Sequence, residues 1–169
     1  MKVAGDKWQM IEYEIKMFYA TYKKFSTRAP YDRLPYVLKN ALEETTVLHT
    51  RILCEVFLSR SKRRDDIRLG DFLPDWPNDP RYGKMKATCD DLTAEYCGKS
   101  NHLESPCWNF NKRLAHPTFH RGREYDYRKN LDALYPLIHD MIRELESLTG
   151  RHFRLRFDGP THPPTLFWT

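Results

Sequence analysis

Basic and imidazole side chains crowd into the stretch NFNKRLAHPTFHR, from Asn109 to Arg121. The Ser-Pro pair just before it supplies a helix N-cap and a first-turn proline. Pro117 disfavours helical geometry at the residue before it, which is His116. The sequence therefore predicts a short helix from 106 to about 115, with His116 at its C-terminal tip.

Two roles are open to His116 at such a helix end. Histidine titrates near neutral pH, so its imidazole can act as an acid or a base, with Lys112 and Arg113 pointing outward beside it. Alternatively, the imidazole caps the helix by bonding to carbonyl groups, as most buried polar side chains do. The sequence leaves both interpretations open.

Metal binding is a further alternative for the same histidines. His116 and His120 are four residues apart, which is the spacing of metal ligands on a helix, and Cys107 or His102 could join them. Pro117 interrupts the helix between the two histidines. We therefore expect no metal site and no cofactor.

A long helix from Pro35 to about Arg60 is the natural support for this cluster. We expect its buried stripe to contain Leu38, Ala41, Leu42, Thr45, Leu48, Ile52 and Val56. A second line of mostly charged residues along the helix consists of Glu44, Leu48, Arg51 and Glu55. His49 lies next to this line, on the edge of the helix that faces the core.

Packing of the short helix across this charged line would create a polar site. Arg51 and Glu44 would then contact Asn111 and His116 in a buried hydrogen-bond network. The alternative is an ordinary ladder of surface charges along the long helix. The sequence does not decide between them.

The remaining elements follow from apolar spacing and from helix-breaking residues. Asp6 and Gln9 resemble a capping box and predict a helix from about 7 to 25, followed by a turn in STRAPYDRLP. The proline-rich stretch from Leu69 to Tyr82 predicts a long loop anchored by Phe72 and Trp76. A third predicted helix ends at Gly98 and contains Met85, Cys89, Leu92 and Tyr96. The last predicted helix ends at Gly150 and contains Leu131, Leu134, Ile138, Met141, Leu145 and Leu148. Pro136 should either kink this last helix or mark its true start.

These elements predict an all-α protein, a four- to five-helix up-and-down bundle with a C-terminal extended arm. The bundle would occupy residues 1–150 and the arm residues 151–169. The arm ends in Leu166, Phe167 and Trp168, which water would solvate poorly, so we expect it to pack on the bundle or on a second subunit.

Composition narrows the class of protein. The chain has 169 residues, which fits one domain, and its aromatic content of 14% is typical of a folded core. A net charge of +5 favours polyanionic partners. The four cysteines form no CxxC pair, so we expect reduced, partly buried thiols. No signal-peptide pattern and no membrane span are visible, and we expect a cytoplasmic protein.

Several segments together resemble a group of small bacterial proteins with a helical bundle like that of the HEPN superfamily. They are MIEYEIKMFYATYKKF, NALEETTVLHTRILCEVFL, LGDFLPDWP and NKRLAHPTFHR, which together span residues 10 to 121. That superfamily includes metal-independent ribonucleases of toxin and defence systems. In these enzymes an arginine and a histidine, four to six residues apart, meet across a homodimer.

The resemblance places the histidine of that motif on His116. The matching arginine would fall between positions 109 and 111, where this chain has Asn109, Phe110 and Asn111. Arg113 is only three residues before His116, so Arg113 or Arg51 would have to supply the cation that stabilises charge on phosphate.

Two functions follow as hypotheses. The first is a non-catalytic homodimer of a toxin-antitoxin or defence type system that binds RNA, a nucleotide or a protein partner. Its binding residues would be Asn111, Lys112, Arg121, Glu44 and His49. The second is a metal-independent RNase in which His116 moves protons and Arg51, Lys112, Arg113 or Arg121 holds the phosphate.

Overall fold

The computed structural model describes residues 3–59, 66–98, 105–115, 125 and 127–153, with the side chains of 3–6 and 113–115 left out. Within these residues every regular element is helical and no strand occurs, which confirms the all-α class. The α-helices are α1 (Val3–Ser26), α2 (Arg28–Asp32), α3 (Tyr36–Phe57), α4 (Gly83–Cys97), α5 (Pro106–Asn109) and α6 (Tyr127–Thr149). Shorter turns are η1 (Leu69–Asp71), η2 (Pro80–Tyr82) and η3 (Phe110–Ala115).

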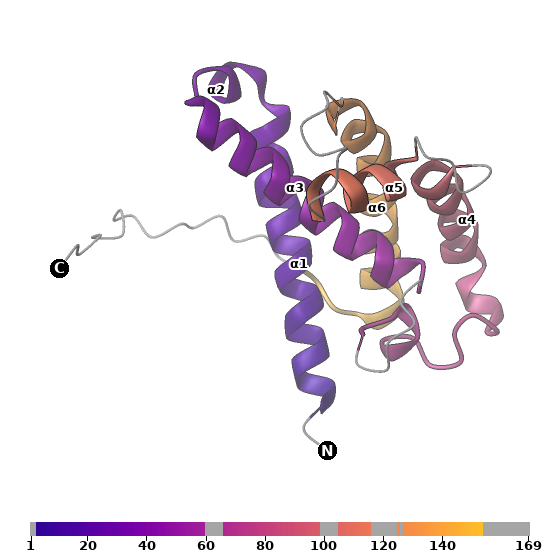
Figure 1. Ribbon diagram of the computed structural model, residues 1–169. Helices are drawn as coiled ribbons and strands as arrows, with labels where there is room; N and C mark the ends of the chain where they lie inside the picture. Colours follow the sequence, from indigo (N-terminus) through magenta and orange to yellow (C-terminus); the bar gives the residue numbers. More distant parts are fainter. Residues whose placement is uncertain (1–2, 60–65, 99–104, 116–124, 126, 154–169) are drawn as a thin grey trace.

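Helices α1, α3, α4 and α6 form the body of the bundle. Helix α1 runs from the N-terminus to α2, and α3 returns from there across α1 (Figure 1). Helix α6 packs against both α3 and α4. The short α5 and the η3 turn that continues it lie across this body, where α5 contacts α4 and η3 contacts α3. No described helix has the length and apolar character needed to cross a membrane.

The predicted pattern of α6 is confirmed residue by residue. Its core side is fully buried and its C-terminal Leu148 is half-buried; the buried side consists of Leu131, Leu134, Ile138, Met141 and Leu145. Each of these side chains contributes about 2 kcal/mol through burial. Gly150, with φ +67°, ends the helix as predicted. Pro136 lies inside α6 on its exposed side, so it does not mark the start.

The predicted buried stripe of α3 is partly wrong. Leu38 and Leu48 are 52% and 48% exposed. The core side instead contains two threonines, whose hydroxyls donate to the carbonyl groups four residues earlier and so need no other partner when buried. This side consists of Thr46, Val47, Thr50, Leu53, Cys54, Val56 and Phe57. The helix begins after Pro35 and ends at Phe57, a turn before the predicted Arg60, which lies outside the described residues.

Two predictions near the N-terminus also need correction. Helix α1 begins at Val3, so Asp6 lies within it and does not cap it. The predicted turn after α1 contains the short helix α2. Tyr31 of α2 packs edge-on against Phe25, and the guanidinium of Arg128 covers both rings at 4.3 and 5.3 Å. These tertiary contacts stabilise a helix that local sequence does not specify.

The loop between α3 and α4 is anchored largely as predicted. Phe72 is buried, with its ring centroid 4.5 Å from that of Trp8, and Trp76 packs on Tyr82 at 5.5 Å. At the other end of the chain, Phe153 is buried beside Trp8, and its backbone N–H donates to buried Glu146. Residues 154–169, which include most of the predicted arm, lie outside the described residues.

Candidate functional site at the junction of α3, α4 and α5

The start of the short helix is confirmed. The Ser105 hydroxyl accepts a hydrogen bond from the backbone N–H of Trp108, and Pro106 occupies the first turn. The helix does not continue to 115 as a single α-helix, however. It becomes a wider π turn, η3, after Asn109.

Two asparagine side chains bond backbone carbonyl groups where the helix type changes. The Asn109 amide donates to the Ser105 carbonyl at 3.0 Å, and the Asn111 amide donates to the Cys107 carbonyl at 2.9 Å. Asparagine side chains compete with the backbone for nearby carbonyl groups, which weakens the regular α-helical pattern. Single π turns of this kind are frequent at functional sites.

Arg51 lies on α3, the helix that η3 contacts. Its Nε donates to the Glu55 carboxylate at 2.8 Å, and the two side chains are 25% and 35% exposed. This hydrogen bond uses one of the five N–H donors of the guanidinium. Within the described parts of the chain, no other hydrogen bond of this guanidinium occurs.

Helix α4 carries Tyr96 next to its last residue, Cys97. Tyr96 is fully buried, and its ring packs on that of Phe110, with the centroids 6.1 Å apart. Its hydroxyl has no hydrogen-bond partner among the residues that the structure describes. Burial raises the pKa of Tyr96, and the nearby Cys54, Cys107 and Glu55 add to the rise. The hydroxyl therefore keeps its proton and remains a donor.

The predicted residues of this cluster are only partly covered by the structure. Asn111 is half-buried and Lys112 is exposed, both on η3. Glu44 is exposed on α3, seven residues before Arg51 and so about 10 Å away along the helix axis. The side chain of Arg113, and the whole of His116 and Arg121, lie outside the described residues. Their predicted roles stay predictions.

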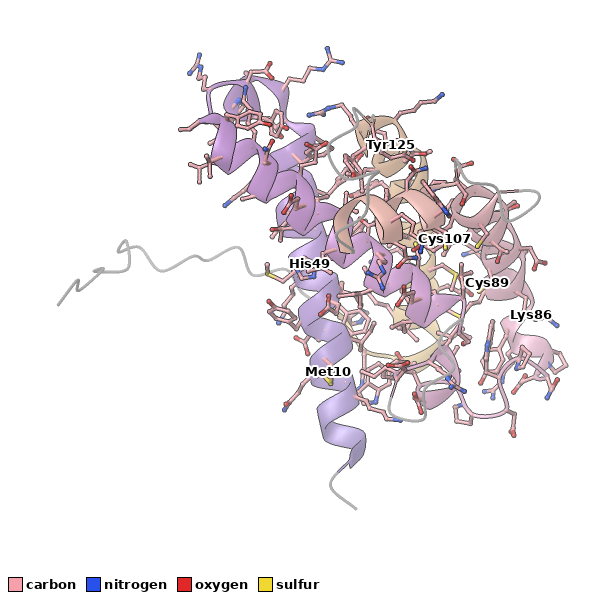
Figure 2. The ribbon with its side chains drawn as sticks, in the orientation of Figure 1. Met10, His49, Lys86, Cys89, Cys107 and Tyr125 are labelled. Carbon is pink, nitrogen blue, oxygen red and sulfur yellow. The ribbon has the colours of Figure 1, made fainter. Side chains whose placement is uncertain are left out.

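His49 belongs to a different region. It lies two residues from Arg51, about 200° around α3, and it is buried against α1. Its Nδ1 lies 2.6 Å from the Glu14 carboxylate of α1, and the ring of Tyr13 meets it edge-on at 5.9 Å. Figure 2 shows His49 beside α1 and Cys107 at α5. The structure therefore separates His49 from Arg51 and Asn111.

No metal site is present among the described residues, in which no three His, Cys, Asp or Glu side chains gather. His102 and His120, two of the alternative ligands considered above, lie outside this part of the chain. Among the described residues, which include all four cysteines, no disulfide is formed. Burial, together with the charge of Asp90, raises the pKa of Cys89 to about 12, so this thiol is a poor thiolate ligand at neutral pH.

Sequence reasoning missed Tyr96 and the Glu55 partner of Arg51 as parts of the site. Tyr96 fits the apolar spacing of its helix, and that spacing predicts a core residue without saying what its hydroxyl meets. Glu55 lies four residues after Arg51, a separation that does indicate a pair, although it is equally common on plain surfaces.

Comparisons with known proteins add no relative: no model of a protein family, no curated protein and no solved structure matches the chain. The candidate site is therefore defined by its own geometry. It combines a half-buried guanidinium, a buried hydroxyl and an exposed lysine on three adjoining elements.

Proposed function

We propose that the protein is a non-catalytic, RNA- or nucleotide-binding helical protein that acts as a homodimer in a toxin-antitoxin or defence type system. The observation that carries the binding proposal is the half-buried Arg51, whose guanidinium bonds only Glu55, through Nε, among the described residues. Guanidinium groups bind phosphate through paired N–H donors, and a partly dehydrated site strengthens such bonds. The net charge of +5 and the exposed Lys112 add attraction for a polyanion.

Fluorescence anisotropy with a fluorescein-labelled single-stranded RNA dodecamer tests this proposal. We expect wild-type affinity to fall as KCl rises from about 50 to 200 mM, because phosphate contacts release counterions. Arg51→Gln should lower the affinity at least about tenfold. Arg81→Gln is the matched control, since it removes the same charge from an exposed guanidinium that bonds Asp79 in the loop before α4. Equal affinities of the two variants would contradict the proposed site.

The dimer is supported by three consecutive apolar side chains at the start of α3. Tyr36, Val37 and Leu38 are 77%, 72% and 52% exposed. Runs of exposed apolar residues are unfavourable in a monomer and are typical of contact surfaces. We expect light scattering to give a dimer for the wild type and a monomer for Val37→Glu. A monomeric wild type at micromolar concentration would remove this part of the proposal.

A metal-independent RNase remains the second candidate. The η3 turn, which packs on α3 and carries Asn111 and Lys112, ends directly before His116. RNA cleavage in EDTA by the wild type, and its loss in His116→Ala with an unchanged melting temperature, would favour the enzyme. Intact RNA after incubation with the wild type would exclude cleavage of that substrate and leave the binding function.

A further inference from the structure

The large apolar side chains that stay most exposed in the described part of the chain fall into two groups. One is the run at positions 36–38, at the start of α3, which supports the dimer. The other consists of Met10 and Tyr13 of α1 and Leu48 of α3, which are 56%, 56% and 48% exposed. These three side chains are called the α1–α3 apolar face below.

The α1–α3 apolar face lies where the two helices pack together. The ring of Tyr13 meets that of His49 edge-on, with the centroids 5.9 Å apart, and Leu48 directly precedes His49 in α3. Met10 lies one turn before Tyr13, on the same side of α1. Ile52, one turn after Leu48, is half-buried. The face is therefore a patch shared by two helices.

The apolar pattern of α3 indicates that this face has a cover. The spacing of the apolar residues in α3 predicts a buried Leu48, yet nearly half of its side chain is exposed. An apolar patch formed by two helices is unfavourable in water and is typical of a contact surface. A segment that packs on Met10, Tyr13 and Leu48 would therefore stabilise the folded protein.

The described chain ends close to this face. Phe153 is buried beside Trp8 of α1, with the ring centroids 6.4 Å apart, and the guanidinium of Arg151 lies 4.2 Å from the Trp8 ring. Met10 and Tyr13 follow Trp8 by two and five residues, so both lie within about 8 Å of it along the helix axis. The segment after Phe153 therefore starts from the part of α1 that carries the face.

Residues 154–169 are long enough to reach the face. Leu166 follows Phe153 by 13 positions, and an extended chain of that length spans up to about 43 Å. The path from Trp8 to Tyr13 is much shorter, even where it passes around a helix about 10–12 Å in diameter. The segment also ends in three consecutive apolar side chains that water solvates poorly: Leu166, Phe167 and Trp168.

We propose that the C-terminal tip, Leu166 to Trp168, docks on the α1–α3 apolar face of its own chain. The tether keeps the tip at a millimolar effective concentration, so at micromolar protein it binds in preference to the tip of a second copy. Pro163 and Pro164, directly before the tip, restrict the chain and reduce the entropy lost on docking. The docked tip covers an apolar patch that α1 and α3 leave exposed.

Photo-crosslinking of the full-length protein identifies the occupant of the face. A p-benzoylphenylalanine in place of Tyr13 puts a photoreactive aromatic ring on the face. After irradiation, we expect mass spectrometry to find the C-terminal tryptic peptide, residues 157–169, attached at position 13 in a product of monomer mass. The same replacement of Tyr36, which lies on the other exposed patch, is the matched control and should not capture this peptide.

The mass of the product separates the possible occupants. Capture of residues 157–169 in a product of dimer mass would place the tip of a second copy on the face and overturn the proposal. Products that lack this peptide would overturn it as well. The Val37→Glu variant, expected to be a monomer, should retain the cross-link, so docking of the tip and dimer formation are tested separately.

A double-mutant cycle measures whether the tip and the face act together. Leu48→Gln and Phe167→Gln should each lower the melting temperature by roughly 2–4 °C, because each removes an apolar contact between the tip and the face. The double variant should melt no lower than the less stable single variant, since either change alone already breaks the contact. Thr161→Gln, outside the tip, should leave the melting temperature unchanged. Single variants that melt as the wild type does, or effects that add in the double variant, would contradict the docking.

Discussion

The face shared by α1 and α6 and the junction of α3, α4 and α5 both contain tyrosines, but they differ in what the phenolic hydroxyls meet. On the first face, the Tyr19 hydroxyl and His139 Nδ1 share a hydrogen bond of 2.7 Å, and Tyr22 donates to Asp132 at 2.8 Å. Burial raises the pKa of both tyrosines, so both hydroxyls stay protonated. The ring of Tyr22 also stacks on that of Tyr135, with the centroids 4.1 Å apart.

The junction has the opposite character. The Tyr96 hydroxyl is more deeply buried than those of Tyr19 and Tyr22, yet it lacks a partner among the described residues. The Arg51–Glu55 pair on α3 is partly exposed, and α5 continues into the π turn η3. The contact between α1 and α6 thus pairs its phenolic hydroxyls, whereas the packing of α4 leaves one buried hydroxyl without a partner among the described residues.

The largest predicted effect is at the contact between α1 and α3, where His49 and Glu14 form a buried pair. Glu14→Ala leaves His49 buried without its carboxylate, because the imidazole is only 6% exposed and Nδ1 bonds Glu14 at 2.6 Å. We expect the free energy of unfolding, measured by urea denaturation at pH 7, to fall by about 2 kcal/mol. Glu12→Ala on the exposed side of α1 should change it by less than about 0.5 kcal/mol. Equal effects of the two substitutions would show that the His49–Glu14 pair is not effectively buried.

Removal of a tyrosine hydroxyl should lower the free energy of unfolding in one region and raise it in the other. Tyr19→Phe leaves the Nδ1 of half-buried His139 unpaired, so we expect a loss of about 1.5 kcal/mol in the free energy of unfolding. Tyr96→Phe removes no bond to the described residues and should add about 1 kcal/mol. Urea denaturation with an unchanged m-value measures both. If Tyr96→Phe is destabilising, its hydroxyl is satisfied in the folded protein and the contrast between the regions is lost.

The features that the sequence predicts well are local. The N-cap and proline at the start of α5, the glycines at positive φ after α4 and α6, and the apolar side of α6 each depend on residues within a turn or two of one another. Propensity and spacing therefore suffice for the all-α class and for the helix ends that a cap, a proline or a glycine marks.

The features that sequence analysis did not predict are set by contacts between distant segments. Thr46 and Thr50 are buried while Leu48 is exposed, because hydroxyls that bond their own helix can face the core where α1 crosses. The partner of His49 comes from a residue 35 positions away. The buried Tyr96 hydroxyl likewise follows from the packing of three elements, which no local pattern specifies.

Removal of the N-cap of α5 tests how much this cap stabilises α5 and the η3 turn. Ser105→Ala removes the acceptor for the Trp108 N–H and should lower the free energy of unfolding by about 1 kcal/mol. Hydrogen exchange should show faster exchange of the backbone amides of α5 and η3, with unchanged protection in α1 and α6. Ser105→Thr, which retains a capping hydroxyl, is the control. Faster exchange across all helices would mean that α5 is coupled to the whole bundle.

The smallest predicted effect is on the stability that the Arg51–Glu55 pair contributes. Glu55→Gln should change the free energy of unfolding by less than about 0.5 kcal/mol, because both members of the pair are partly exposed and their order along the helix is the less favourable one. Glu14 of α1 pairs with His49 of α3, and Glu55 pairs with Arg51 within α3. The same urea measurements therefore compare the contributions of the two pairs to the free energy of unfolding. A loss as large as that of Glu14→Ala would mean that the partly exposed Arg51–Glu55 pair holds the fold as strongly as the buried His49–Glu14 pair.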